Sequence, residues 1–194
     1  VAFVPRRSSN ADISTLNRYF GKRKNGEFKT AGIEIEQSSS CQYVKDCQME
    51  MIKALDRDLD PEDAIKVMKK YEKDLKTGKV DFQDLIIEKK VSKSPEAYKS
   101  ANRTFHAAKR YRKHGIEIRP GQKVRYIVRD DTIDSMDRVR LGFEEKTGYD
   151  NSFYIEQLKK ACQSVLTPFK KKKKEIEEYL KDASDTYLQE RAGI

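Results

Sequence analysis

The chain has no tryptophan, only three cysteines and five prolines, and no long apolar run. A membrane-spanning helix needs roughly 18 to 20 apolar residues in succession, and no stretch approaches that length. The first residues, VAFVPRR, lack the layout of a signal peptide, so we expect no secretion. Cys41, Cys47 and Cys162 form an odd set without a CxxC pair, which favours free thiols in a reducing compartment. We therefore expect a cytoplasmic protein.

Charged residues, in contrast, are abundant. They make up 38% of the 194 residues, and the mean hydropathy of −0.88 is low for a compact globule. The length suffices for one domain or two small ones with a buried core. Two architectures fit this composition: a narrow core with wide hydrated faces, or an elongated piece of a larger assembly.

The positive charge is concentrated between Leu85 and Val128. This segment has 12 lysines and arginines against 3 acidic residues, a net charge of +9 that equals the net charge of the whole chain. Four aromatic or imidazole side chains are interleaved with these charges: Tyr98, Phe105, His106 and Tyr111. Such a segment is typical of a surface that holds a polyanion, most often nucleic acid. The alternative is a solvated basic helix face.

The first 80 residues predict a small β-layer covered by two helices. We expect a strand at residues 1–5 and a hairpin of strands 18–22 and 27–35 around the Asn25-Gly26 turn. Helical spacing of apolar residues, with Asp60-Pro61 as a helix start and Gly78 as a stop, predicts the two helices. Their expected buried faces contain Val44, Cys47, Met51, Ile52 and Leu55, then Ala64, Met68, Tyr71 and Leu75.

The remainder predicts a mainly helical region with a short β-hairpin, so the fold class is α+β. Strands are expected at 85–91, 123–129 and 138–143, with a helical turn at Ser94-Pro95. A helix over 102–114, ended by Gly115, should turn Lys109, Arg110 and Lys113 outward. A last helix, capped by Asn151 or Ser152, precedes Pro168 and a charged helical tail over 170–188. Its expected buried face contains Ile155, Leu158, Cys162, Val165 and Leu166.

Four aspartates between two strands are the most tempting candidate for a metal site. They are Asp130, Asp131, Asp134 and Asp137, with arginines at both ends of the loop. We interpret the loop as a solvated turn. His106 and His114 lack partners at zinc-ligand spacing, and the cysteines do not supply them. We therefore predict no metal ligand and no catalytic residue in this chain.

Several blocks of the sequence resemble the C-terminal part of archaeal family B DNA polymerases, from about Val1 to Phe169. They read RYFGKRKNGEFKTAGIEIEQ, LIIEKKVSKSPEAYK, HAAKRYRKHGIEIRPGQKVRYIV and YDNSFYIEQ, in the family's order. The resemblance implies that residues 1–80 form the closing portion of the polymerase palm. Residues 81–194 would form the thumb, which grips primer–template duplex, followed by the charged tail.

The resemblance also implies a set of DNA-binding residues. Tyr19 stands at the tyrosine of a short lysine-x-tyrosine motif, whose lysine is replaced here by Asn17. Gly32-Ile33-Glu34 matches the family, but Glu36, Gln37 and Ser38 stand where basic residues are expected. The predicted DNA-binding residues are Asn17, Arg18, Tyr19, Lys22, Lys29, Lys90, Ser92, Lys93, Tyr98, Lys99, Arg103, His106, Lys109, Arg110 and Arg119.

By the same resemblance, the aspartates that hold two metal ions for nucleotidyl transfer lie in palm motifs that precede this sequence. We expect no cofactor in this chain and Mg²⁺ in the active site of a partner. Some archaea carry such a polymerase split into two polypeptides. This chain resembles the smaller one, which would pair its palm strands with a larger subunit carrying the exonuclease and the catalytic palm. A nucleoid-associated location follows.

Two other functions remain open. The chain fits a stand-alone DNA-binding module derived from an inactivated polymerase, which the loss of basic residues at Glu36 and Ser38 favours. It also fits an interaction protein whose lysine run, residues 170–174, contacts RNA or a sliding clamp. Family members often end in a clamp-binding peptide, but Gln189 is followed only by ERAGI, so that motif is absent or cut short.

Overall fold

The computed structural model describes residues 2–5, 14–58, 60–94, 101–145 and 147–169. The chain divides into two compact units. The first contains the described residues up to Gln37, then Val44–Asp74, and those from Glu156 onward; the second contains Ser38–Tyr43 and Leu75–Ile155. The chain thus enters the second unit twice, at Ser38 and at Leu75, and only the second entry lies near the expected boundary at residue 80; it returns to the first unit within α4 (Asn151–Leu166). That these units correspond to palm and thumb stays a prediction.

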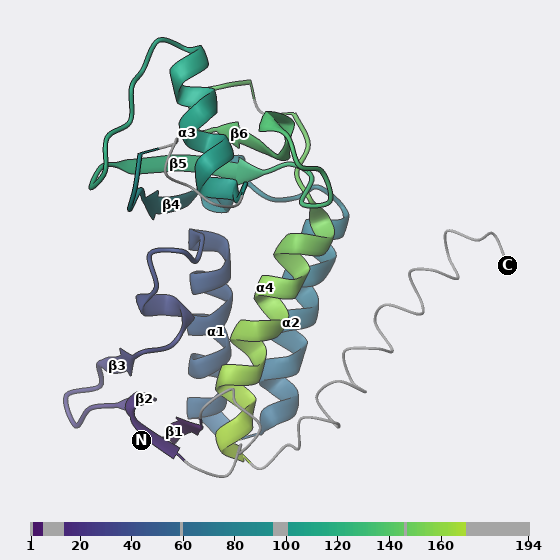
Figure 1. Cartoon of the computed structure of the whole chain (residues 1–194). Helices are drawn as coiled ribbons and strands as arrows, with labels where there is room; N and C mark the ends of the chain where they lie inside the picture. Colours follow the sequence, from purple (N-terminus) through teal and green to yellow (C-terminus); the bar gives the residue numbers. More distant parts are fainter. Residues whose placement is uncertain (1, 6–13, 59, 95–100, 146, 170–194) are drawn as a thin grey trace, which may run out of the picture. The chain divides into compact units, whose positions relative to one another are not determined.

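A three-stranded antiparallel sheet opens the first unit (Figure 1), with strand β1 (Ala2–Pro5), β2 (Ser14–Lys22) and β3 (Phe28–Ala31) in the order β1-β2-β3. Asn25-Gly26 forms the turn between β2 and β3 as predicted, and the register pairs Phe20 with Thr30 and Lys22 with Phe28. The expected second strand is shorter than predicted, because a 3-10 turn, η1 (Glu34–Glu36), follows it. Within the described residues, β1 and β3 each pair with β2 alone.

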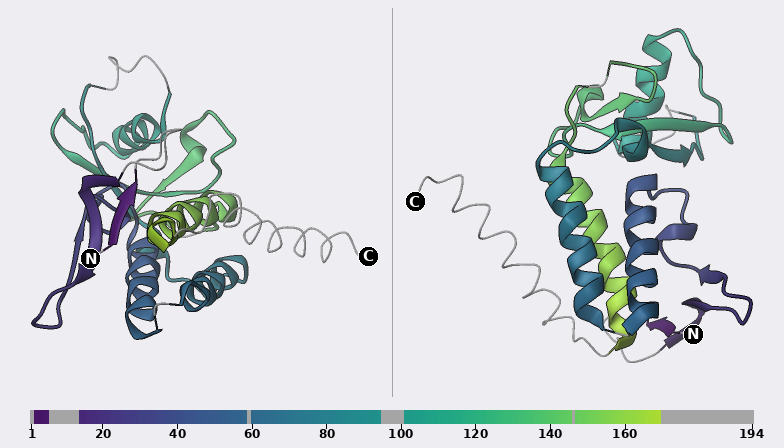
Figure 2. Two further views of the ribbon diagram at one scale, coloured as in Figure 1. Left: turned by 90° about the horizontal axis from the view of Figure 1, so that it is seen from below. Right: turned by 180° about the vertical axis from the view of Figure 1, so that it is seen from behind.

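Three helices lie side by side in this unit, as Figures 1 and 2 show. They are α1 (Gln42–Asp58), α2 (Pro61–Lys76) and the later part of α4 (Asn151–Leu166). Most residues of the predicted faces are buried: Met51 and Met68 are 0% exposed, and Leu55 and Leu166 only 1–2%. Burial of such a side chain stabilises the fold by about 1.5–3 kcal/mol. Tyr71 and Ile155 are only half-buried. The Asp60 carboxylate accepts a hydrogen bond from the Glu62 amide at 2.9 Å, which confirms the predicted start of α2.

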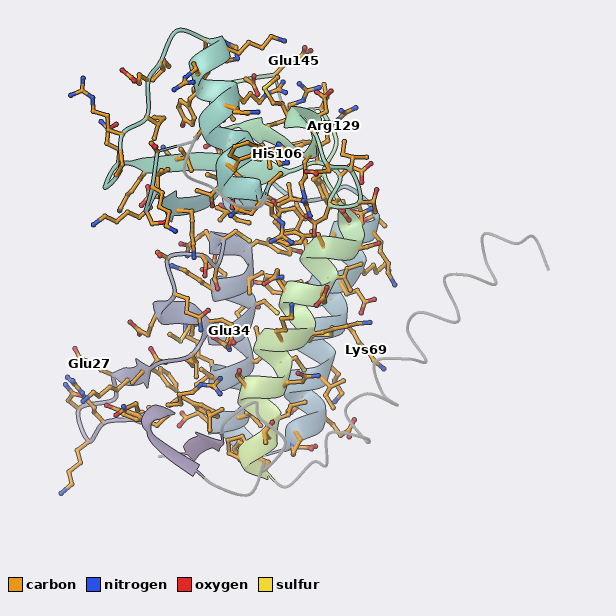
Figure 3. All side chains as sticks on the ribbon, in the orientation of Figure 1. Glu27, Glu34, Lys69, His106, Arg129 and Glu145 are labelled. Atoms are coloured by element: carbon orange, nitrogen blue, oxygen red, sulfur yellow. The ribbon has the colours of Figure 1, made fainter. Side chains whose placement is uncertain are left out.

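A buried polar network joins the loop after β3 to helices α1 and α4. Gln48 Nε2 donates to Glu34 Oε2 at 2.7 Å and to the Ala161 carbonyl at 3.0 Å, and Gln48 Oε1 accepts from the Ile35 amide at 2.9 Å. Ser164 Oγ donates to Glu34 Oε1 at 3.2 Å. Figure 3 shows Glu34 close to α1, whereas Glu27 lies at the tip of the hairpin. Glu34 is 4% exposed, so this network lets a carboxylate be buried.

The second unit contains the three other strands that the sequence predicts, paired in one antiparallel sheet. They are β4 (Ile87–Lys90), β5 (Lys123–Val128) and β6 (Val139–Leu141), in the order β4-β5-β6. Helix α3 (Arg103–Lys113) packs on β5 and β6 (Figure 1). The 3-10 turns η2 (Phe82–Leu85) and η4 (Met136–Arg138) precede β4 and β6. The predicted α+β class is confirmed.

Helix caps in this unit follow the sequence at one end and depart from it at another. Asn102 caps α3 through its side chain, which accepts from the Phe105 amide at 3.0 Å, and Gly115 follows the helix with φ +74°. Helix α4 is capped by Asp150, whose carboxylate accepts from the Phe153 amide at 2.9 Å, so the prediction of Asn151 or Ser152 is wrong by one or two residues. A carboxylate is favoured there because its negative charge also interacts favourably with the positive N-terminal end of the helix dipole.

Two sequence predictions lie outside the described residues: the helical turn that begins at Ser94-Pro95 and the charged tail over 170–188. A short 3-10 turn, η5 (Thr167–Phe169), ends α4 at the predicted proline. Among the helices of the described ranges, none is both long and apolar enough to cross a membrane.

Candidate nucleic-acid interface

Helix α3 is the basic helix of the predicted interface, and one row of its basic side chains turns inward. Arg103, His106 and Arg110 recur at helical spacing along that row. His106 is 4% exposed and Arg110 is 9% exposed. The prediction that Arg110 faces outward is therefore wrong. Figure 3 shows His106 on the first turn of the helix.

Acidic residues of the loop before β6 and of the turn after it meet this inner row. Arg103 binds both carboxylate oxygens of Asp131, at 2.7 Å and 2.5 Å, and His106 Nε2 lies 2.8 Å from Asp134 Oδ1. Arg110 Nε donates to both oxygens of Glu144, at 2.7 Å and 2.6 Å. The predicted solvated turn holds for Asp134 and Asp137, whose side chains are 72% and 59% exposed. Asp131 departs from it, because its carboxylate is only 25% exposed and pairs with Arg103 of α3.

The protonation of these acids follows from the contacts. Burial by itself raises the pKa of the Asp131 carboxyl, but hydrogen bonds from Arg103 and Arg138 outweigh it and leave the pKa below its usual value. Burial likewise opposes ionisation of Glu144. Hydrogen bonds from Arg110, the Leu141 amide and His114 outweigh that effect and lower its pKa. Both acids are therefore ionised counter-ions, and in the described ranges no cluster of three or more potential metal-binding side chains is found.

Exposed basic residues gather at the end of the sheet where β4 finishes and β5 begins. The Val91 amide donates to the Gln122 carbonyl at 2.8 Å, and the Gly121 amide donates to the Val91 carbonyl at 2.8 Å. These bonds bring residues 90–93 alongside residues 119–123. We call the four exposed cations of this region the strand-end cluster: Lys90, Lys93, Arg119 and Lys123.

The strand-end cluster places like charges opposite one another. Lys90 and Lys123 are direct partners in the β4–β5 register. Like charges in that position destabilise a sheet. Lys123 is offset by Glu88, whose carboxylate lies 2.5 Å from Lys123 Nζ, whereas no ion pair of Lys90, Lys93 or Arg119 occurs among the described residues. The cluster therefore carries uncompensated positive charge suited to a polyanion.

The outer side of α3 adds further exposed cations. Lys109 and Lys113 point outward as predicted. The Lys109 ammonium lies 4.6 Å from the centre of the Phe105 ring, which holds the lysine stem on the helix while the charge faces solvent. Arg103 is less available, since its guanidinium also lies 4.4 Å from the centre of the Phe153 ring.

The predicted DNA-binding residues of the first unit are partly occupied by the protein itself. Arg18 donates to the Gly32 carbonyl at 3.2 Å and to Ser164 Oγ at 3.0 Å. Lys22 Nζ lies 2.6 Å from the Asp56 carboxylate, and Lys29 lies 5.6 Å from the centre of the Tyr19 ring. Asn17 is exposed.

The structure thus brings together three of the predicted residues, Lys90, Lys93 and Arg119, with Ser92 exposed between the first two. Lys123 belongs to the same cluster and was missed. Its signal was the alternation of basic and apolar residues in KVRYIV, which places Lys123 and Arg125 on one side of the strand. Tyr98 and Lys99 lie outside the described residues.

Comparison with protein families places this surface in context. Residues 16–180 match the model of DNA polymerase family B. The chain is 30% identical over 167 residues to a DNA polymerase of Thermococcus hydrothermalis, an alignment that covers 84% of this chain and 10% of that protein. It is 26% identical over 156 residues to a DNA polymerase of Archaeoglobus fulgidus, covering 72% of this chain and 20% of the relative.

A solved structure shares the fold. It is the family B DNA polymerase from the hyperthermophilic archaeon Pyrobaculum calidifontis, with a TM-score of 0.63 and 22% identity. The similarity covers 79% of this chain and 20% of that one. The chain therefore spans a fifth or less of the length of each of these three proteins.

Proposed function

Because the chain belongs to DNA polymerase family B, as the match over residues 16–180 establishes, we propose that it is the non-catalytic small subunit of a split DNA polymerase. In this role it completes the palm and supplies the thumb that grips primer–template duplex. The observation that carries the proposal is the strand-end cluster, with its uncompensated lysines and arginine, in a chain of this family.

The chemistry of the cluster suits a duplex backbone. Duplex phosphates repeat along each strand, so a gripping surface needs several exposed cations close together. Lys90, Lys93, Arg119 and Lys123 meet that need, and Lys109 and Lys113 add charge on α3. Lysine and arginine contacts to phosphates carry no sequence information, and a polymerase must hold every sequence that it has just made.

The open edges of the sheet in the first unit support the proposal of a partner subunit. Within the described residues, the outer edges of β1 and β3 have no strand beside them. An open edge invites pairing with another strand, and we propose that strands of a larger polypeptide extend this sheet. That polypeptide would carry the exonuclease, the catalytic aspartates and their Mg²⁺ ions.

A native pull-down with this chain as bait tests the split polymerase. We expect a co-purifying polypeptide with exonuclease and aspartate-bearing palm motifs, and primer extension by the eluate that the bait alone does not show. A bait that binds duplex DNA but brings no such polypeptide would contradict the proposal.

That outcome would instead support the second candidate, a stand-alone DNA-binding module. One observation favours this alternative. Glu36 stands where relatives of this family are expected to carry a basic residue, and its carboxylate accepts a hydrogen bond from Thr30 Oγ1 at 2.5 Å. The loop thus presents an acid, held in place, near the predicted DNA-binding residue Lys29.

A further inference from the structure

An exposed aromatic ring lies beyond the strand-end cluster, just after β6. Phe143 is 55% exposed, and among the described residues only Ile116, at 42%, is a comparably exposed large apolar side chain. The Phe143 ring contacts Tyr111 and His114 of α3, with ring centroids 5.6 Å and 5.4 Å apart and interplanar angles of 70° and 80°. We call these three rings the aromatic platform.

Hydrogen bonds hold the platform in place. His114 Nε2 lies 2.6 Å from Glu144 Oε1, and Glu144 is fixed in turn by Arg110 and by the Leu141 amide at 2.8 Å. The Tyr111 hydroxyl accepts from the Arg125 amide at 3.4 Å. Phe143 is therefore exposed but packed against fixed neighbours. Little conformational entropy of the site is lost when a ligand stacks on it.

The surroundings of the platform carry a small positive charge. Arg112 and Lys113 are exposed in the last turn of α3, and Arg125 is exposed beside Tyr111. Glu117 and Glu145 are exposed acids nearby in the sequence, and Figure 3 shows Glu145 toward the C-terminal end of α3. Three cations against two acids leave about one net charge, too little for the many phosphates of a duplex but suited to a single nucleotide.

We propose that the aromatic platform binds an unpaired base of single-stranded nucleic acid, which stacks on Phe143 while a neighbouring arginine or lysine meets its phosphate. Every base has a π-face, so stacking on an aromatic side chain tolerates any sequence. Bases inside a duplex are already stacked and do not offer that face. The platform would therefore contact an unpaired base, whereas the strand-end cluster would contact duplex phosphates. A test of the platform does not depend on whether the cluster binds duplex.

The absence of tryptophan from the chain allows a direct test. In the full-length protein, F143W introduces one indole at the platform. We expect its emission to be quenched by an oligothymidine single strand, with a matched duplex giving much weaker quenching. The control is F82W, which places an indole on η2, where no DNA-binding residue is predicted and the Tyr149 ring lies 5.7 Å from the Phe82 ring. It should respond weakly to the single strand.

Affinity measurements on variants without tryptophan complete the test. F143A should weaken binding of the single strand by roughly 5- to 150-fold, the range found when a stacking residue is truncated, whereas F143Y should retain most of the affinity. Equal quenching of F143W and F82W, or unchanged affinity of F143A, would overturn the proposal. So would concentration-dependent self-association that F143A abolishes without any response to the oligonucleotide, because the platform would then be a contact between copies.

Discussion

Arg110 Nε lies 2.7 Å and 2.6 Å from the two carboxylate oxygens of Glu144, and the two side chains are only 11% and 10% exposed. An arginine from the most basic stretch of the chain thus stabilises the fold instead of facing a ligand. Arg103 likewise contacts both oxygens of Asp131, and His106 makes a single contact to the exposed Asp134. The net charge of the segment from Leu85 to Val128 therefore overstates the amount of positive charge that is available to bind DNA.

Neutralising Glu144 should destabilise the second unit. E144Q keeps the shape of the side chain but removes the charge that Arg110 and His114 contact, and hydrogen bonds to charged groups contribute about 1.5–3 kcal/mol each. We expect the midpoint of urea unfolding to fall by the corresponding amount, with an unchanged slope. The control is K66Q, which breaks the exposed pair to Asp63 and should leave the midpoint nearly unchanged.

The same acids should make the protein sensitive to low pH. The pKa values of Asp131 and Glu144 are lowered in the folded state, so their stabilising contribution is complete above the unfolded-state values of about 4. It is lost as the pH falls through the folded-state values. Unfolding followed by circular dichroism from pH 6 to pH 2 should show this loss, and E144Q should show a shallower decline. An equally steep decline in E144Q would exclude Glu144 as a source.

Gly32 should tolerate no side chain. Its φ of +61° already favours glycine, and a Cβ there would meet the Asn17 carbonyl oxygen at 2.3 Å. We expect G32A to lower stability beyond the roughly 1–2 kcal/mol that a left-handed conformation costs an L-residue. G78A isolates that conformational cost, because Gly78 has φ +72° and nothing within 4 Å of its Cβ position. Equal losses in the two variants would show that the Asn17 backbone moves away.

Removing charge from the strand-end cluster should weaken duplex binding in a salt-dependent manner. Each phosphate that the protein neutralises contributes about 0.9 to the slope of log K against log salt, so K90A/K93A should reduce that slope by up to roughly 1.8. Fluorescence anisotropy with a primer–template duplex at several salt concentrations measures it. K53A/K79A removes the same charge from exposed lysines outside the cluster and should leave the slope unchanged. Identical slopes in both double variants would remove the cluster from the interface.

The three cysteines should be unreactive in the folded protein. Cys41, Cys47 and Cys162 are each at most 2% exposed. Burial raises the pKa of the Cys162 thiol to about 12 and also raises that of Cys47, so neither forms appreciable thiolate at pH 8. A colorimetric thiol assay should detect almost none of them before denaturation and all three afterwards. Rapid reaction of a thiol in native buffer would reveal local opening of the helices.

The sequence predicts most of the secondary structure because local signals and packing agree there. The apolar spacing of α1, the Asp60-Pro61 start of α2 and the Asn25-Gly26 turn each specify the backbone directly. The cap of α4 was misplaced because Asp150, Asn151 and Ser152 are all acceptable caps. The Asp150 carboxylate has a second role, accepting from the Asp131 amide at 2.7 Å, which depends on tertiary structure.

The candidate site was less predictable because the exposure of its residues depends on tertiary structure. Whether a basic residue of α3 faces solvent depends on acids about 30 residues away in sequence, and neither the position of Asp131 nor that of Glu144 indicates its partner. Lys90 and Lys93 were predicted from the family resemblance, and their exposure agrees with that prediction. Lys123 was missed because its contribution depends on the register that places it opposite Lys90.

Gln48 offers the sharpest test of how the first unit positions its loop. It is 0% exposed and connects Glu34, the Ile35 amide and the Ala161 carbonyl across three elements. Q48L keeps the bulk of the side chain but deprives these buried groups of their bonds to it, which should cost at least about 2 kcal/mol in urea unfolding.

A double-mutant cycle with E34Q then separates the network from simple packing. Because Gln48 and Glu34 are hydrogen-bonded partners, E34Q/Q48L should lose less stability than the sum of the single losses, by about 0.5–3 kcal/mol. Additive losses would mean that the 2.7 Å contact contributes little. A coupled cycle would show that the loop carrying Gly32 and Glu34 is held on α1 and α4 by polar bonds, so that changes in those helices reach this loop.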